Sequence, residues 1–132
     1  MDIVVRFPGG KKVDACFEGF VVQTDQSLND GGCGEAPEPF SLFLSSIGTC
    51  TGIYVLRFCE QRNISTDDMS LLLKTSKGDD GLIDTITVSI CVGEDFPEKY
   101  MNALVKAASL CTVKRLLDKP PTIQLSVQRV TI

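Results

Sequence analysis

The feature that most constrains the fold is an uncharged segment in the middle of the chain. No Asp, Glu, Lys or Arg occurs between Phe40 and Leu56, a stretch of 17 residues. A helix over this stretch would be apolar nearly all round, and such helices usually form the buried centre of a fold. Glu38-Pro39 precedes the segment, and proline suits the first position of a helix. We therefore expect a central helix that opens at Glu38-Pro39 and ends near Asn63.

A membrane-spanning helix is the alternative for this segment. A span needs about 20 predominantly apolar residues, and this stretch is shorter and contains five serine and threonine side chains, at Ser41, Ser45, Ser46, Thr49 and Thr51. The opening Asp2-Ile-Val-Val-Arg lacks the pattern of a secretory signal. The sequence therefore favours a cytoplasmic protein that has no membrane partner.

Gly48 and Gly52 lie four residues apart and so share one face of the predicted helix. Because glycine has no side chain, another backbone can approach this face closely. The same helix of a second copy would fit there, which favours a homodimer. An ordinary contact between helix and sheet is the alternative, and the sequence does not separate the two.

The remaining pattern mixes strands and helices without regular alternation. A long loop is expected from Asp25 to Pro39, a helix from Pro97, and a short helical piece between Cys111 and Pro120. Strands are predicted at 2–7, 12–18, 20–24, 69–76, 82–92 and 122–132. This order is typical of an α+β fold, here as a single domain over residues 1–132.

Charge excludes one class of partner. The 132 residues carry a formal net charge of −4, and Lys and Arg are scattered instead of forming a basic stripe. Proteins that bind nucleic acid usually concentrate positive charge on one face. We therefore expect no nucleic-acid partner.

Two of the six cysteines stand out, because Cys50 and Cys111 each close an apolar helical run, 40–50 and 101–111. Two separate elements could bring these thiols together in an apolar pocket, where a pair can carry out redox chemistry. Lys114 and Arg115 follow Cys111 within one turn, and nearby cations favour a thiolate. The alternative is that both are small core residues, which is common for free cysteine.

Cys50 would gain a second source of activation if the central helix broke near Gly48. Thr49 would then cap the second half, and Cys50 would lie at a helix N-terminus, which favours negative charge. Without such a break, Cys50 lies in the middle of a helix and is buried.

The other four cysteines lie in poorer contexts. Cys59 follows Cys50 by nine residues, about 900° of helical rotation, and so points to the opposite face. Cys16 and Cys91 fall on the polar faces of predicted strands, and Cys33 lies in the glycine-rich loop, where adventitious oxidation is expected. The chain has no Cys-x-x-Cys motif and no histidine, so we expect no metal site and no cofactor.

Three blocks of sequence resemble one known family. They are Thr24-Asp-Gln-Ser with Gly31-Gly32, then 36–50 (Ala-Pro-Glu-Pro-Phe-Ser-Leu-Phe-Leu-Ser-Ser-Ile-Gly-Thr-Cys), and later 107–117 (Ala-Ala-Ser-Leu-Cys-Thr-Val-Lys-Arg-Leu-Leu). The chain is similar in these blocks to the osmotically inducible protein C / organic hydroperoxide resistance family. The expected order of strands and helices agrees with that family over nearly the whole chain.

The resemblance implies an intertwined homodimer, in which sheets from both chains wrap two long buried central helices. It also implies a catalytic pair. Cys50 would attack an organic hydroperoxide and become a sulfenic acid, and Cys111 would condense with it to a disulfide that a dithiol reductant reopens. This sequence of states follows the known oxidation chemistry of cysteine.

Two departures from the family pattern concern activation. Characterised peroxidases of the family have a glutamate ten residues before the first cysteine, where this chain has Phe40. They also hold the thiolate with an arginine from the N-terminal half. Arg6 is the only arginine before Cys50, and we expect it to be a surface charge. Glu38 is a candidate substitute for the carboxylate, and Thr112 stands where relatives often have proline.

Three functions follow from these residues. The first is a thiol-dependent peroxidase for organic hydroperoxides. The second is a non-enzymatic dimer that senses redox state or binds a small molecule, which the missing glutamate and arginine favour. The third, a thiol hydrolase or transferase, lacks an obvious base, since the chain has no histidine.

Overall fold

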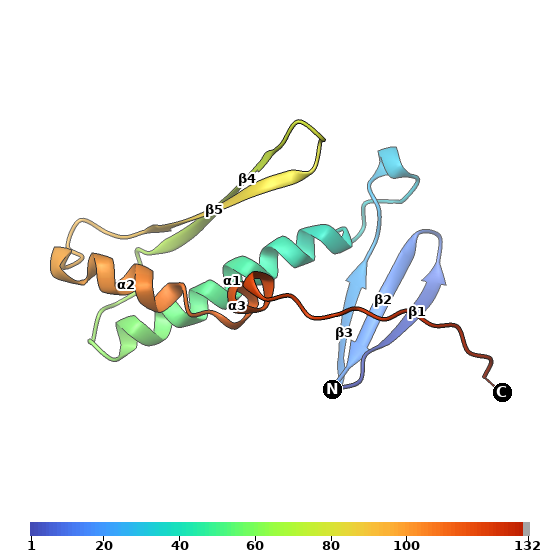
Figure 1. Ribbon diagram of the computed structural model, residues 1–132, viewed down its shortest axis with the longest axis horizontal. Helices are drawn as coiled ribbons and strands as arrows, with labels where there is room; N and C mark the ends of the chain where they lie inside the picture. Colours follow the sequence, from blue (N-terminus) through green and yellow to red (C-terminus); the bar gives the residue numbers. More distant parts are fainter. Residues whose placement is uncertain (131–132) are drawn as a thin grey trace. The chain divides into compact units, whose positions relative to one another are not determined.

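The computed structural model describes residues 1–130, which belong to two compact units divided after Ile47. Figure 1 follows the elements along the chain. The strands are β1 (Val4–Gly9), β2 (Lys12–Phe17), β3 (Phe20–Thr24), β4 (Ser70–Lys77) and β5 (Ile83–Cys91). The α-helices are α1 (Pro39–Glu60), α2 (Met101–Ala108) and α3 (Thr112–Asp118), with single 3-10 turns at Leu28–Asp30 and Glu98–Tyr100. The α+β class is therefore confirmed.

The first unit contains an antiparallel sheet in the order β1-β2-β3. Two tight turns join the strands: the first follows Gly9, and the second places Gly19 at φ 83°, a conformation that suits glycine. β1 begins two residues later than expected and reaches Gly9, since the pairing shifts register between Arg6 and Gly9. β2 and β3 pair from Val13 with Thr24 to Phe17 with Phe20.

The loop after β3 is organised around the buried carboxylate of Asp25, which is 1% exposed. Its oxygens accept hydrogen bonds from the backbone N–H groups of Gln26, Cys33 and Glu35 at 2.8, 3.3 and 3.2 Å. The loop folds so tightly that a Cβ on Gly32 would overlap the carbonyl of Gln26. A single acidic side chain thus holds together the loop that leads into α1.

We expect Asp25→Ala to lower the melting temperature at neutral pH, because three backbone donors lose their acceptor. Hydrogen bonds, first of all that from Gln26, lower the pKa of Asp25, although burial opposes this. The carboxylate therefore stabilises the fold in full above its unfolded-state pKa of about 3.9, and this contribution is lost as the pH falls through the lower folded-state value. The melting-temperature gap between wild type and variant should shrink below about pH 4.

Thermal melts over a pH series measure this gap. Asp30→Ala is the matched control, since Asp30 is an exposed carboxylate in the same loop. A gap that stays constant from neutral pH into the acid range would contradict the role given to Asp25.

The second unit has a hydrophobic core between the end of α1, the β4–β5 hairpin and α2. Its buried residues are Val55, Phe58, Cys59, Phe96, Leu104 and Ala108. Leu71 of β4 and Ile90 of β5 pack against this cluster, as expected from the alternation of apolar residues in both strands. The guanidinium of Arg62 lies over the ring of Phe58, 3.6 Å from its centroid, and closes the end of the core.

Helix α1 is unbroken from Pro39 to Glu60, so the break considered near Gly48 does not occur and Cys50 lies in mid-helix. A Cβ on Gly48 would lie 3.6 Å from Cδ1 of Leu73 in β4, an ordinary helix–sheet contact, whereas Gly52 faces open space. By length and composition alone, α1 is the one helix within residues 1–130 that could cross a membrane. Core helices of soluble proteins pass the same test.

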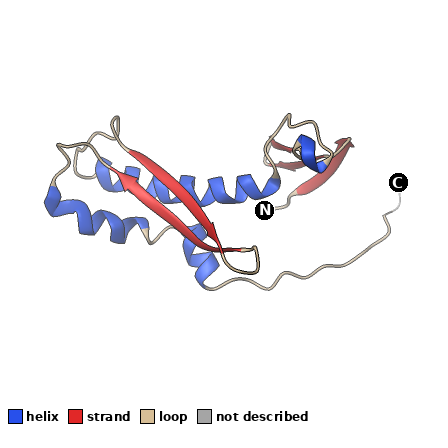
Figure 2. Ribbon diagram, turned by 90° about the horizontal axis from the view of Figure 1, so that it is seen from above, coloured by secondary structure: helices blue, strands red, loops and turns tan. Residues whose placement is uncertain are grey.

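The predicted last strand is wrong for the residues described. Segment 119–130 has no regular secondary structure, and Figure 2 shows it as an extended chain after α3; residues 131 and 132 lie outside the described part. A strand needs a neighbour for its backbone N–H and C=O groups, and no strand within residues 1–130 pairs with this segment. Its alternating apolar side chains are consequently exposed, Leu125 to 95% and Val127 to 100%.

Candidate redox site

The sulfur of Cys111 is fully buried and has two hydrogen-bond donors. Cys111 is the N-cap of α3, and its Sγ accepts the backbone N–H of Lys114 at 3.4 Å. The hydroxyl of Thr51 on α1 donates to the same sulfur at 3.6 Å. Capping by a side chain satisfies one of the free N–H groups at the start of a helix. The sulfur is thereby held between two elements that are 60 residues apart in sequence.

This contact places Cys111 next to the turn of α1 that carries Cys50. Thr51 follows Cys50 directly, and neighbouring Cα atoms lie about 3.8 Å apart. Cys50 is half-buried, Cys111 is buried, and both are free thiols. Cys111 thus contacts the chain neighbour of Cys50, and the pairing of the two thiols stays a prediction.

A second contact lies one turn further along α1. The hydroxyls of Tyr54 and Thr112 are 3.3 Å apart, so the residue after Cys111 also reaches α1. The guanidinium of Arg57 lies 5.8 Å from the centroid of the Tyr54 ring. Cys50, Tyr54 and Arg57 are spaced i, i+4 and i+7, which puts them on one helix face. Sequence reasoning missed Arg57 on this face, although the spacing alone could have revealed it.

The ammonium of Lys114, a cation expected to favour the Cys111 thiolate, has another partner. The ammonium of Lys114 pairs with Asp118 at 2.9 Å, and it is the backbone N–H of Lys114 that contacts the sulfur. The i, i+4 spacing of Lys114 and Asp118 brings these side chains together on the exposed side of α3. The sulfur of Cys111 is therefore next to the backbone N–H dipole of Lys114, whereas the sequence predicted the full charge of the Lys114 ammonium there.

The candidate activating residues Glu38 and Arg6 lie in the first unit. Oε1 of Glu38 accepts the backbone N–H of Ser27 at 3.2 Å. Arg6 is exposed on β1, as expected, with Asp14 opposite it on β2. Phe40, which occupies the position of the family glutamate, stacks on Phe43 with ring centroids 5.6 Å apart.

Cys59 is the cysteine whose environment differs most from that of Cys50. It lies in the core of the second unit, fully buried, with its sulfur 3.9 Å from that of Met69. Burial raises the pKa of the Cys59 thiol, against a smaller opposing effect of Arg62. Because the thiolate is the reactive form, Cys59 is suited to packing. Cys16 is half-buried, and Cys91 is exposed.

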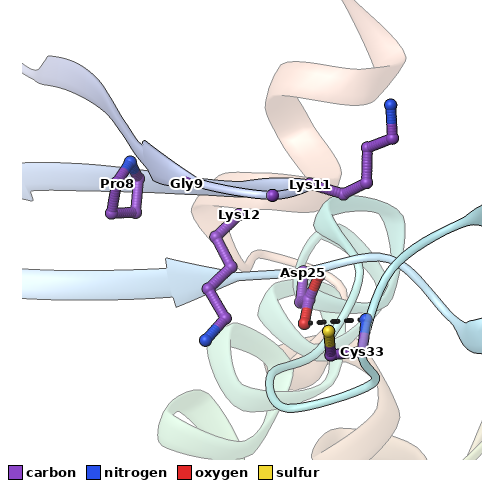
Figure 3. Close-up of a pocket in the computed structure, with 7 residues that line it drawn as sticks. Pro8, Gly9, Lys11, Lys12, Asp25 and Cys33 are labelled. Carbon is purple, nitrogen blue, oxygen red and sulfur yellow. Dashed lines mark hydrogen bonds between the residues drawn. The ribbon is translucent and has the colours of Figure 1, made fainter.

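Cys33 is exposed, as its glycine-rich loop suggested, and borders a separate hollow in the first unit. Figure 3 shows this hollow, of about 300 Å³, with Lys11, Lys12, Asp25 and Cys33 in its wall. The ammonium of Lys12 is paired with Glu35 at 2.5 Å. Over the described residues, no three His, Cys, Asp or Glu side chains gather as metal ligands would.

Comparison with known proteins bears on this site. The family model described as OsmC-like protein matches residues 31–126, which include both Cys50 and Cys111. Comparison with curated proteins gives no match.

Three solved structures share the fold. An OsmC-like protein from Mycoplasma pneumoniae aligns with a TM-score of 0.71 at 13% identity, covering 90% of this chain and 87% of that one. The organic hydroperoxide resistance protein OhrB of Bacillus subtilis aligns with a TM-score of 0.55 at 20% identity, covering 91% and 93%. The organic hydroperoxide resistance protein OsmC of Legionella pneumophila aligns with a TM-score of 0.54 at 18% identity, covering 90% of each chain.

Proposed function

Because the chain belongs to the OsmC-like protein family, in which structural neighbours carry organic hydroperoxide resistance names, we propose that it is a thiol-dependent peroxidase for organic hydroperoxides. The observation that carries this proposal is the contact between Cys111 and Thr51, the neighbour of Cys50. It supports the pairing of the two thiols, because Thr51 lies in the same turn of α1 as Cys50. Cys111 has a buried, hydrogen-bonded sulfur, and Cys50 is a half-buried free thiol.

The proposed cycle needs only these two residues, a hydroperoxide and a dithiol. The Cys50 thiolate attacks one peroxide oxygen, the O–O bond breaks, and the alkoxide leaves and takes up a proton as the alcohol. Cys50 is thereby oxidised to a sulfenic acid. The Cys111 thiol then displaces the sulfenic oxygen as water, and the S–S bond forms. A dithiol reductant reopens this disulfide by exchange and is itself oxidised.

The substrate class follows from the side chains on the Cys50 face of α1. Tyr54 lies one turn after Cys50 and Ile47 one turn before it, with Phe43 a further turn back. An apolar face favours a hydroperoxide with a fatty or aromatic tail over hydrogen peroxide, since burial of the tail contributes about 25 cal/mol per Å². Arg57 lies on the same face and is the only Lys or Arg among residues 50–57.

The proposal includes a homodimer of a single OsmC-like domain, residues 1–132, in the cytoplasm. Both units of the single chain expose apolar side chains that a soluble protein normally covers. In the first unit Phe7 is 82% exposed and Phe20 65% exposed. In the second, Ile123, Leu125 and Val127 are exposed along the C-terminal segment. An intertwined partner would give that segment the strand neighbour it lacks.

Hydroperoxide consumption tests the function directly. In a stopped-flow assay with cumene hydroperoxide and a dithiol reductant, we expect Cys50→Ser to reduce consumption to the rate without protein. Loss of the attacking sulfur leaves no route to the sulfenic acid. Cys91→Ser serves as the control, because Cys91 is an exposed thiol on β5, and it should consume hydroperoxide at the wild-type rate. Equal consumption by wild type and Cys50→Ser would refute the proposal.

A redox sensor is the second candidate, and the altered activating residues favour it. Phe40 stacks on Phe43 where family peroxidases have a glutamate, and Glu38 is engaged with Ser27. A slow Cys50 would form one disulfide per oxidation event without sustained turnover. The same assay separates the two functions, because a sensor yields a stoichiometric disulfide without catalytic consumption of hydroperoxide.

A further inference from the structure

The hydrogen bond from Thr51 to Cys111 has features of a positioning contact. Both residues are buried, with Thr51 8% exposed and Cys111 0% exposed, and the hydroxyl donates to Sγ at 3.6 Å. The backbone N–H of Lys114 donates to the same sulfur from α3. The sulfur is therefore oriented by one donor on its own helix and by one on α1.

We propose that Thr51 is a positioning residue, which holds the Cys111 sulfur at the turn of α1 occupied by Cys50 and so sets the rate of disulfide closure. This inference rests on the proposed function and adds to it a residue that neither the motif nor the cysteine count points to. The affected step is the second one: Cys111 S–H and Cys50 S–OH become S–S and water.

The physical argument concerns side-chain rotation. A cysteine side chain has three staggered rotamers, and only some of them turn Sγ toward α1. A hydrogen bond to the Thr51 hydroxyl favours such a rotamer by a net free energy of about 0.5–1.5 kcal/mol. Losing that preference should slow closure by roughly 3- to 10-fold, since about 1.4 kcal/mol corresponds to tenfold.

The docking of α3 does not depend on this bond alone. Tyr54 and Thr112 form a separate contact one turn away, at 3.3 Å. A change at Thr51 should therefore alter the direction of the sulfur while the two elements stay together. Thr51→Val is the sharpest variant, because valine keeps the branched shape and removes the hydroxyl.

The experiment follows the two oxidation steps separately. Each protein receives one equivalent of cumene hydroperoxide; dimedone traps the sulfenic acid, and alkylation with mass spectrometry measures the Cys50–Cys111 disulfide over time. We expect Thr51→Val to form the sulfenic acid at the wild-type rate and to close the disulfide roughly 3- to 10-fold more slowly. Thr51→Ser, which keeps the hydroxyl, should restore most of the rate.

The matched control is Thr49→Val, the same change two residues earlier at an exposed position of α1, and it should close the disulfide as fast as wild type. Melting temperatures monitor folding, and Thr51→Ala provides a second variant without the hydroxyl should valine unfold the protein. Disulfide closure at the wild-type rate in folded Thr51→Val or Thr51→Ala would overturn the proposal.

Oxidation with diamide distinguishes this failure from failure of the proposed function. Diamide joins two thiols without a sulfenic acid, so it reports the approach of the sulfurs alone. Slow closure of Thr51→Val with diamide supports the role of Thr51 even if wild type does not consume hydroperoxide, in which case only the peroxidase function fails. Equal closure rates with diamide count against Thr51 whatever the hydroperoxide result.

Discussion

Replacing Cys111 with Ser is expected to stop hydroperoxide turnover after two equivalents per chain, one to form the sulfenic acid of Cys50 and one to oxidise it to the sulfinic acid. Cys50 would still reduce one molecule of hydroperoxide, but its sulfenic acid would find no thiol at the neighbouring position. The sulfenic acid would then accumulate and, with excess hydroperoxide, advance to the irreversible sulfinic acid. A burst followed by a flat trace in stopped-flow, with a mass increase of two oxygens on the Cys50 peptide, is the predicted signature.

Serine also preserves most of the local structure, which makes this variant informative. Its hydroxyl can accept the N–H of Lys114 as the N-cap of α3, a position at which serine is favoured. Cys59→Ser is not a suitable comparison, because Cys59 lies in the core. Cys91→Ser is, since Cys91 is exposed. Sustained multiple turnover by Cys111→Ser would remove Cys111 from the cycle and leave Cys50 to react directly with the external reductant.

Val127→Asp is expected to convert the proposed dimer into monomers. Val127 is 100% exposed in the single chain, and in the proposed assembly a partner would cover it. Placing an unpaired carboxylate in such a contact costs about 3–5 kcal/mol, which weakens association by roughly 100-fold or more. Sedimentation velocity at micromolar concentration measures the change in mass.

Ser126→Asp tests whether added charge alone has this effect. Ser126 adjoins Val127 on the same extended segment and is also exposed, but alternation puts it on the opposite face of a strand. We expect Ser126→Asp to remain dimeric. A wild-type protein that sediments as a monomer would contradict the proposed dimer, and two variants that dissociate alike would contradict the predicted face.

Local patterns were sufficient for most of the fold. The uncharged run and Pro39 predicted α1 to within three residues at its C-terminal end. Alternation predicted β4 and β5 to within one residue at each end. These elements bury one face within the same chain, so that their periodicity records the environment that they occupy.

The C-terminal segment shows where such reasoning fails. Segment 122–130 alternates as clearly as β5 does, yet it forms no strand. Alternation reports which side chains are suited to a sheet, whereas a strand also requires a neighbour with free backbone groups. No residue of the segment itself carries information on whether that neighbour exists.

The candidate site was predictable in part for a similar reason. Cys50 and Cys111 stood out because each ends an apolar run, but Thr51 did not, since hydroxyl residues are common along α1. Its contact with Cys111 depends on how α3 docks on α1, which is a tertiary property. The contact of the Lys114 backbone N–H with the Cys111 sulfur likewise depends on the N-cap geometry at Cys111.

The sulfur of Cys111 has two roles: it is the N-cap acceptor of α3, and it is a partner in the proposed disulfide. The sulfur that caps the first turn of α3 is also the one proposed to form and lose a bond to Cys50 in every cycle. A sulfur in a disulfide is a weaker hydrogen-bond acceptor for the Lys114 N–H group. Helix α3 leads directly into the exposed C-terminal segment. Oxidation at the buried thiol would thus loosen the first turn of the helix that anchors this segment, so that a chemical event in the interior reaches the surface through a single capping bond.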